Sequence, residues 1–340
     1  MNLGEEKLLS IRDLHTGFRF QDEYFDAVDG VDLDLYRNEF LAIVGESGCG
    51  KSTIATSIVG LHDPNYTRVS GEINYMGENL LHYSEEQLNA VRGKEIGFIF
   101  QDPLASLNPL HRVGQQIEEA LLYHTDLNKE ERYDRVLELL EQVGIPYPER
   151  TYRQFPHQLS GGMRQRVLIA MALSCKPNII IADEPTTALD VTIQAQILDL
   201  IVEIQKEIGA GIILITHDLG VVAQMADRVA VMYAGQIVEL ADAKELFSNP
   251  LHPYTRSLMK SIPQSDDDEE LHVIQGVVPS LRYLPREGCR FAPRIPWIPQ
   301  DAHEANPVLH QVKPGHFVRC SCHQHFHFEG EGGDHVVSRS

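Results

Sequence analysis

The chain has 340 residues, with 29 Lys and Arg against 49 Asp and Glu, and its formal net charge is −20. This length predicts about two domains and a core large enough to fold without disulfides or metals. The negative charge argues against nucleic acid as the main partner, since that binding depends on neutralising phosphates, and five cysteines indicate a reducing compartment rather than a disulfide scaffold.

No segment of the sequence predicts a signal peptide or a membrane span. The N-terminus has no positive stretch followed by an apolar core. The longest apolar runs, 179–182 and 212–215, are far below the roughly 20 residues that cross a bilayer. We therefore expect a cytosolic chain whose work at a membrane would need a partner.

Strand and helix patterns alternate along the first 245 residues. Residues 8–14 and 28–35 alternate between apolar and polar, as half-buried strands do. Continuous apolar runs of buried-strand length lie at 40–44, 179–182 and 212–215. Helical spacing over 191–208 separates the last two runs. Buried strands that alternate with helices predict an α/β fold around a mostly parallel sheet.

Two segments interrupt this pattern, and the composition changes again toward the C-terminus. Residues 71–100 predict a small antiparallel β layer, and residues 103–172 predict a helical insert. The acidic run 265–270 is most simply a solvated linker. From residue 279 the chain is rich in proline and weakly periodic, and we expect the Gly-rich tail 326–340 to be loose.

Residues 45–52 match the pattern G-x-x-x-x-G-K-[ST] between a predicted strand and a predicted helix. Glycines there let backbone N–H groups curl around phosphate oxygens, and the helix N-terminus adds its positive dipole end. Lys51 would place a cation on those oxygens, and the Ser52 hydroxyl would ligate Mg²⁺. The predicted ATP-binding residues of this loop are Gly45, Glu46, Ser47, Gly48, Cys49, Gly50, Lys51, Ser52 and Thr53.

Four polar side chains follow the predicted strands at the edge where a parallel sheet binds its ligand. Asp183 would hold Mg²⁺, and Glu184 is the candidate general base that activates the attacking water. His217 follows another apolar run, where its imidazole could bond the γ-phosphate and orient the water. Gln101 could contact Mg²⁺ or the water. We predict Glu184, His217 and Gln101 as catalytic residues.

A second anion site is predicted within residues 159–166, Leu-Ser-Gly-Gly-Met-Arg-Gln-Arg, before a helix. One nucleotide does not need two γ-phosphate sites in one chain. We therefore predict a head-to-tail dimer in which this site serves the nucleotide of another subunit. The residues that would act on the partner's ATP are Ser160, Gly161, Gly162 and Gln165.

These motifs together resemble the ATP-binding-cassette (ABC) ATPases. The phosphate loop, Gln101, the 159–165 signature, the acidic strand 179–184, Ala188-Leu189-Asp190 and His217 stand in that family's order. Met163 departs from the glutamine that is commoner in the signature. The resemblance implies ATP and Mg²⁺ as ligands. It also implies an upstream aromatic that stacks on adenine, for which Phe18 has the right offset, with Phe20 and Tyr24 as rivals.

A narrower resemblance covers almost the whole chain. Residues 101–109, 252–255 and 288–294 are similar to those of ATPases of bacterial oligopeptide, dipeptide and nickel importers. It implies a cytoplasmic-face subunit, a second ABC ATPase, two transmembrane permease subunits that dock on the helical insert, and an extracytoplasmic solute-binding protein. We therefore expect a nucleotide-binding domain (1–245), a transporter-type C-terminal extension (246–325) and a flexible tail (326–340).

The predicted function is ATP hydrolysis that drives peptide uptake through transmembrane partners. One alternative is a soluble cassette ATPase that is not tied to a transporter. A second alternative is an importer of nickel or another small solute. A third is a cassette that binds ATP without turnover, against which the presence of both Glu184 and His217 argues.

The C-terminal cysteines fit a metal site incompletely. The narrower family often carries four cysteines there that resemble an iron–sulfur site, and Cys289 and Cys320 match two of them. Ile295 and His303 stand where the other two are expected, so an intact cluster of four thiolates is in doubt. Cys322 and His303 could complete a set of four iron or zinc donors. For the segment that also holds His323, His325 and His327, a solvated tail is the preferred interpretation, ahead of an adventitious zinc or nickel site.

Overall fold

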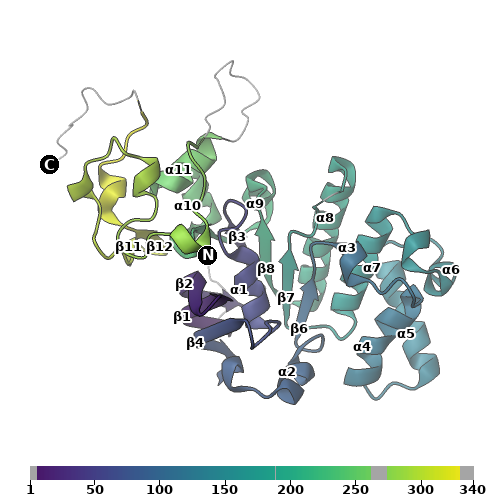
Figure 1. Ribbon diagram of the computed structural model, residues 1–340. Helices are drawn as coiled ribbons and strands as arrows, with labels where there is room; N and C mark the ends of the chain where they lie inside the picture. The colour runs from purple at the N-terminus through teal and green to yellow at the C-terminus, as the bar shows by residue number, and fades with distance from the viewer. Residues whose placement is uncertain (1–5, 188, 262–273, 330–340) are drawn as a thin grey trace.

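The computed structural model describes residues 6–187, 189–261 and 274–329, and two β-sheets organise them (Figure 1). The smaller sheet is antiparallel, in the order β2-β1-β4-β5. Its strands are β1 (Lys7–Phe20), β2 (Glu23–Tyr36), β4 (Thr67–Tyr75) and β5 (Glu78–Asn79). The expected antiparallel layer is confirmed, but the range 71–100 predicted for it is only partly right, because Glu85–Val91 form helix α2 and Ile96–Ile99 form β6 of the larger sheet. The first two strands of the layer form a hairpin longer than the sequence pattern predicts.

The larger sheet has eight strands in the order β11-β12-β10-β9-β3-β8-β7-β6. The five strands from β9 to β6 run parallel, as predicted, and the other three pair antiparallel. The strands are β3 (Phe40–Val44), β6 (Ile96–Ile99), β7 (Ile179–Asp183), β8 (Gly211–Thr216), β9 (Arg228–Tyr233), β10 (Gln236–Asp242), β11 (Leu309–Lys313) and β12 (His316–Arg319).

The parallel strands are apolar throughout because both of their faces are covered. Leu41 and Ile43 of β3 pack into one core with α1 and the smaller sheet, whereas Phe40 packs on the other face with the helical insert and α8. A third core lies beneath the C-terminal extension. The helices are α1 (Lys51–Ile58), α2 (Glu85–Val91), α3 (Pro103–Ser106), α4 (Val113–His124), α5 (Lys129–Gln142), α6 (Pro148–Arg153), α7 (Gly161–Leu173), α8 (Val191–Ile208), α9 (Leu219–Met225), α10 (Ala243–Ser248) and α11 (Pro253–Lys260).

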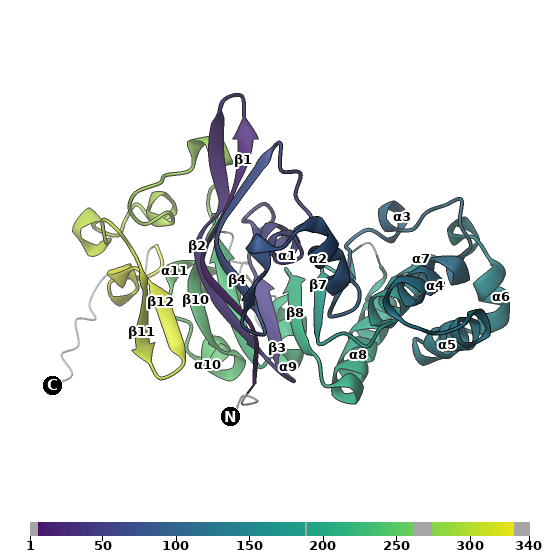
Figure 2. The ribbon, with the colours of Figure 1, turned by 90° about the horizontal axis from the view of Figure 1, so that it is seen from below.

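The helical insert and the C-terminal extension lie on opposite sides of the two sheets (Figure 2). Helices α3 to α7 form the insert where the sequence predicts it. The extension is more ordered than its weak periodicity suggests, because β12 pairs with β10 and so continues the larger sheet. The predicted acidic linker 265–270 and most of the predicted loose tail fall outside the described residues.

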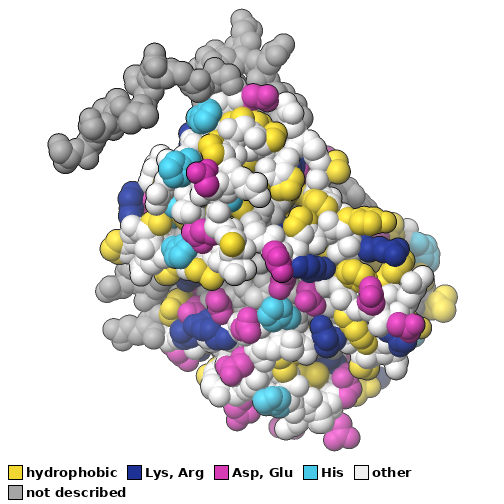
Figure 3. Space-filling view, turned by 60° about the vertical axis from the view of Figure 1, so that its left-hand side comes forward, with side chains coloured by type: hydrophobic (Ala, Val, Ile, Leu, Met, Phe, Trp, Pro, Cys, Tyr) yellow, Lys and Arg dark blue, Asp and Glu magenta, His cyan; other side chains and the backbone are white. Residues whose placement is uncertain are grey.

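The surface carries charges of both signs. On the face seen in Figure 3, acidic and basic side chains are interspersed. Among the described residues, none of the helices has both the length and the apolar character needed to traverse a bilayer.

Candidate functional site

The predicted site residues gather at one edge of the larger sheet. The loop 45–50 leaves β3, Asp183 ends β7, His217 follows β8, and Gln101 follows β6. Because these strands are parallel neighbours, their carboxyl ends meet at the same edge. The fold therefore brings together residues that are more than 100 positions apart in the sequence.

The phosphate loop has a backbone that only glycine fits at Gly50, whose φ is 105°. A Cβ atom there would lie 2.4 Å from the carbonyl oxygen of Ala27. The Lys51 ammonium donates to the carbonyl oxygens of Gly45 (2.8 Å) and Glu46 (3.1 Å), and the side chain is 5% exposed. Lys51 is thus folded back over the loop, where a phosphate would replace those carbonyl contacts.

Cys49 is a packing residue within this loop. Its side chain is 1% exposed and belongs to the core formed with α1. Burial raises the pKa of the Cys49 thiol, and the nearby Lys51 ammonium offsets this in part. A thiol with a raised pKa is a poor nucleophile, so this geometry favours a packing role for the Cys49 side chain.

Ser52 and Asp183 form a pair suited to a divalent cation. The Ser52 hydroxyl donates to Asp183 Oδ1 at 2.9 Å. Neighbouring ligands in an octahedral Mg²⁺ site also lie about 2.9 Å apart, since each is 2.0–2.1 Å from the ion. Burial raises the pKa of Asp183, the hydrogen bond from Ser52 lowers it in part, and the adjacent Glu184 raises it further. A cation would relieve the cost of that buried charge.

Glu184 is held by three side chains, of which Gln101 and His217 come from other segments. Gln101 Nε2 and Thr187 Oγ1 each donate to Glu184 Oε2 at 3.0 Å. His217 Nδ1 lies 3.6 Å from Oε1. The backbone of Glu184 adopts a φ of 45°, a left-handed conformation that is costly for a residue with a side chain. These contacts fix the carboxylate at the strand end, beside Asp183.

The signature residues do not join the phosphate loop of the same chain. Ser160 caps α7 by accepting a hydrogen bond from the Met163 N–H, and Ser160 and Gly161 are exposed. Helix α7 lies apart from α1 in both ribbon views. Gln165 differs from the other predicted signature residues, since it is 1% exposed and its side chain lies inside the insert.

The predicted aromatic residues lie at the tip of the β1–β2 hairpin. Phe18 is half-buried, and its ring meets His62 edge-on with centroids 5.8 Å apart. Phe20 and Tyr24 are more open, with 55% and 38% of their surfaces exposed. Because Tyr24 pairs with Arg19, it lies on the opposite face of the hairpin from Phe18 and Phe20, so one ligand could not stack on all three rings.

Comparison with known proteins identifies the family to which this chain belongs. The ABC transporter family matches residues 28–187, and the oligopeptide/dipeptide transporter C-terminal region matches residues 238–297. Over 326 residues the chain is 52% identical to the oligopeptide transport ATP-binding protein OppD of Lactococcus lactis subsp. cremoris, covering 95% of this chain and 96% of that protein. The chain belongs to the family of ABC transporter ATP-binding proteins.

Two further relatives place this ABC protein more closely. It is 49% identical to the dipeptide transport ATP-binding protein DppD of Bacillus subtilis, covering 94% of this chain and 93% of that one. A dimeric ATP-binding cassette solved in a post-hydrolysis state with ADP and Pi has a TM-score of 0.63 and 31% identity, covering 69% of this chain and 99% of that chain. These matches confirm the predicted family and the α/β cassette fold.

The C-terminal extension of this ABC protein touches the phosphate loop directly. Arg294, which is 5% exposed as a side chain, donates to the Glu46 carboxylate at 2.7 Å and 3.3 Å. The Glu46 N–H donates to the Tyr254 hydroxyl at 2.8 Å. Neither Arg294 nor Tyr254 was predicted as a contact of Glu46. The motifs 252–255 and 288–294 contain them, but nothing local shows which residue more than 200 positions away they contact.

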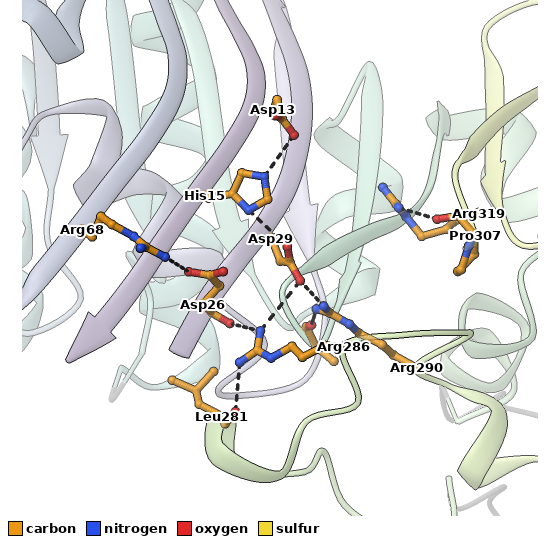
Figure 4. A network of polar contacts seen from close by, with 11 residues as sticks. Asp13, His15, Asp26, Asp29, Arg68, Leu281, Arg286, Arg290, Pro307 and Arg319 are labelled. Atoms are coloured by element: carbon orange, nitrogen blue, oxygen red, sulfur yellow. Dashed lines mark hydrogen bonds and ion pairs between the residues drawn. The ribbon is translucent and has the colours of Figure 1, made fainter. Parts of the chain in front are cut away.

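A second set of contacts joins the extension to the β1–β2 hairpin (Figure 4). Arg290 pairs with Asp29 and donates to the carbonyl oxygen of Ala234. Arg286 donates to the carbonyl oxygen of Asp26 at 3.0 Å. Because the Ala27 carbonyl packs against Gly50, this hairpin also borders the phosphate loop. The extension is therefore built onto the candidate ATP site from two directions.

Replacing Arg294 by methionine should destabilise this ABC protein. The change leaves Glu46 without its buried cation, and we expect a loss of about 1–3 kcal/mol in the free energy of unfolding. Thermal unfolding with and without ATP measures this loss. Lys313→Met is the matched control, since it breaks an exposed pair with Glu245 between the same two regions and should cost below about 0.5 kcal/mol. Equal stability of the two variants would contradict a structural role for Arg294.

The structure brings the doubtful C-terminal donors together. Ligand atoms of Cys289, His303, Cys320 and Cys322 all lie within 4.8 Å of one another. Within the described ranges, His323, His325 and His327 are not part of this group. The His323 ring instead bonds the carbonyl oxygen of Cys320 at 2.9 Å. Ile295, at a position expected to hold a cysteine, is 1% exposed and belongs to the apolar core.

Proposed function

We propose that this chain is the ATP-hydrolysing subunit of a peptide importer and drives uptake through transmembrane partner subunits. The similarity to oligopeptide and dipeptide transport ATP-binding proteins, which continues through the C-terminal extension, carries this proposal. The solved cassette covers 69% of the chain, so the extension is the part that distinguishes peptide-transport relatives from a minimal cassette.

The proposed chemistry assigns one task to each group at the sheet edge. Lys51 and the loop N–H groups would hold the β- and γ-phosphates, and Ser52 and Asp183 would hold Mg²⁺. The ion would neutralise charge that develops on the phosphate oxygens. Glu184 would accept a proton from the attacking water, and Gln101 and His217, which already contact Glu184, would position that water and the γ-phosphate.

The proposed working unit is a head-to-tail dimer with an identical or similar cassette. Ser160, Gly161 and Gly162 form an exposed or partly exposed helix N-terminus that lies apart from the phosphate loop of its own chain. This arrangement supports their action on the partner's ATP, with Ser160 donating its hydroxyl to the γ-phosphate. Gln165 would act indirectly, by packing beneath the α7 N-terminus, because its side chain is buried.

The helical insert supports the proposed docking of two permease subunits at the cytoplasmic face of the membrane. Leu104 and Leu110, close after Gln101, have 63% and 81% of their surfaces exposed. Large apolar side chains that remain this exposed favour a protein partner. An extracytoplasmic solute-binding protein would complete the system. The proposed division of the chain is a nucleotide-binding domain (1–245), a C-terminal extension (246–325) and a tail (326–340).

Leu110→Asp should weaken permease binding while leaving ATP binding unchanged. A charge at that position would have to be desolvated on docking, so we expect at least a 10-fold loss of co-purifying permease. Affinity isolation of the full chain from solubilised membranes, followed by mass spectrometry, measures this loss. The matched control is Met76→Asp, an exposed apolar residue at the β4–β5 turn. Equal recovery with both variants would count against the insert as the docking surface.

The proposed function itself is tested with the complete reconstituted transporter. Labelled peptide should enter vesicles only with ATP, the wild-type chain, the isolated permease subunits and the solute-binding protein present. A chain that recovers no permease, or that supports uptake of nickel but not of peptide, would overturn the proposal.

A further inference from the structure

A compact group of metal-binding side chains lies in the extension, away from the ATP site. Its four members are Cys289, His303, Cys320 and Cys322. The three cysteines are 8%, 1% and 0% exposed. The four ligand residues come from three separate stretches of chain that only the fold brings together. Nothing in the proposed ATP chemistry uses them.

The spacing of the donors fits one ion better than a cluster. All four ligand atoms lie within 4.8 Å of one another. In a tetrahedral zinc site with Zn–S bonds of 2.3 Å, neighbouring sulfurs are about 3.8 Å apart. A four-iron cluster places each thiolate on a different iron, so its own iron–sulfide core holds the four thiolates further apart, and it normally takes four cysteines. This chain offers three, and Ile295 cannot serve as a ligand.

The backbone conformation around the cysteines helps to direct their sulfur atoms toward one another. Cys320 adopts a φ of 71°, a strained conformation for a residue with a side chain, and it turns the chain directly after β12. The Ser321 N–H donates to the Glu304 carboxylate at 2.8 Å, and the His323 ring bonds the carbonyl oxygen of Cys320 at 2.9 Å. Contacts of this kind fix the orientation of side chains that bind a metal.

His303 contributes a buried ring nitrogen that no hydrogen bond accounts for within the described ranges. Its Nδ1 is buried and has no hydrogen-bond partner among the described residues. Buried polar atoms in proteins are nearly always paired, so an unpaired nitrogen in an imidazole ring that lies within ligand reach of three cysteine sulfurs is explained by a missing ligand. Histidine and thiolate are the donors that zinc prefers in closed tetrahedral sites.

We propose that Cys289, His303, Cys320 and Cys322 bind one Zn²⁺ in a closed structural site, in place of an iron–sulfur cluster. Three thiolates and one Zn²⁺ carry a net charge of −1, and Arg290 and Arg319 line the same small cavity as Cys289 and Cys320. The ion joins the 289–294 loop to β12, which is paired with β10 of the cassette sheet. Because this loop carries Arg290 and Arg294, the ion also holds two of the arginines that contact the cassette.

Metal analysis of the full chain, purified without added metal under anaerobic conditions, tests the identity of the ion. We expect one zinc per chain and no stoichiometric iron or acid-labile sulfide. Iron with sulfide would overturn the proposal in favour of a cluster. A well-folded chain that contains no metal and binds no added Zn²⁺ would overturn it as well.

Variants and cobalt test the ligands. Cys320→Ser should lose the equivalent of zinc, whereas Cys175→Ser, at a half-buried cysteine at the end of α7, should retain it. His303→Ala should weaken zinc retention against a chelator at least 10-fold. If Cys320→Ser does not fold, the visible spectrum of Co²⁺ exchanged into the wild-type chain tests the ligands instead, because thiolate-rich tetrahedral Co²⁺ has intense visible bands. An octahedral Co²⁺ spectrum, or equal zinc in the two cysteine variants, would contradict the assigned ligands.

Discussion

Replacing Glu184 by glutamine should lower the rate of ATP hydrolysis by about 100-fold or more while ATP binding remains intact. The amide keeps the shape of the side chain and its contacts with Gln101 and Thr187, but it cannot accept a proton from water. Loss of a positioned general base typically costs 10²–10⁴ in rate. Single-turnover hydrolysis, together with nucleotide binding measured by calorimetry, separates the two effects.

The control for this variant is Glu207→Gln, which removes the same charge from an acceptor on α8 outside the site. It should hydrolyse ATP at the wild-type rate. We also expect the Glu184 variant to accumulate as an ATP-bound dimer, because closure no longer leads to hydrolysis. Wild-type hydrolysis by the Glu184 variant would remove this residue from the role of base.

Replacing Lys51 by methionine should instead weaken ATP binding. Methionine keeps most of the apolar stem but removes the ammonium, which is buried and held by two loop carbonyls. Hydrogen bonds to charged groups contribute about 1.5–3 kcal/mol each, so ATP affinity should fall by roughly 10- to 100-fold. Hydrolysis at low ATP concentration should fall with it. Equilibrium titration with a fluorescent ATP analogue measures the affinity.

Lys94→Met is the control, because Lys94 is an exposed lysine that lies outside the loop. Its ATP affinity should be that of the wild type. The pair of experiments distinguishes binding from chemistry, since the Lys51 variant loses the first and the Glu184 variant loses the second. A Lys51 variant with unchanged affinity would show that the loop N–H groups alone hold the phosphates.

Most of the cassette fold follows from the sequence pattern. The apolar runs that became β3, β7 and β8 are continuous because both faces of a parallel sheet are covered. The pattern failed for β11 and β12, whose residues are mostly exposed or alternate too briefly to be periodic. Those strands form because β12 pairs with the edge of β10 and β11 pairs with β12, and these pairings depend on the tertiary structure.

The same division applies to the candidate ATP site. The loop 45–52 can be recognised from the sequence because the residues that would hold phosphate are contiguous and their spacing is set by backbone geometry. Arg294 and Tyr254, which both contact Glu46, carry no such signal. Each is an ordinary residue in its own segment, and its role depends on which residue the fold places within hydrogen-bonding distance.

The sequence by itself determined the family and the α/β class, and it supplied the candidate phosphate-binding, acidic and signature residues, because each motif is encoded within a few consecutive positions. Only the tertiary structure decided how the C-terminal extension meets the phosphate loop and that Cys289, His303, Cys320 and Cys322 converge on one point. Periodicity and motif spacing describe neighbours along the chain. Contacts between residues 15 to 250 positions apart depend on how whole elements pack, which no local pattern specifies.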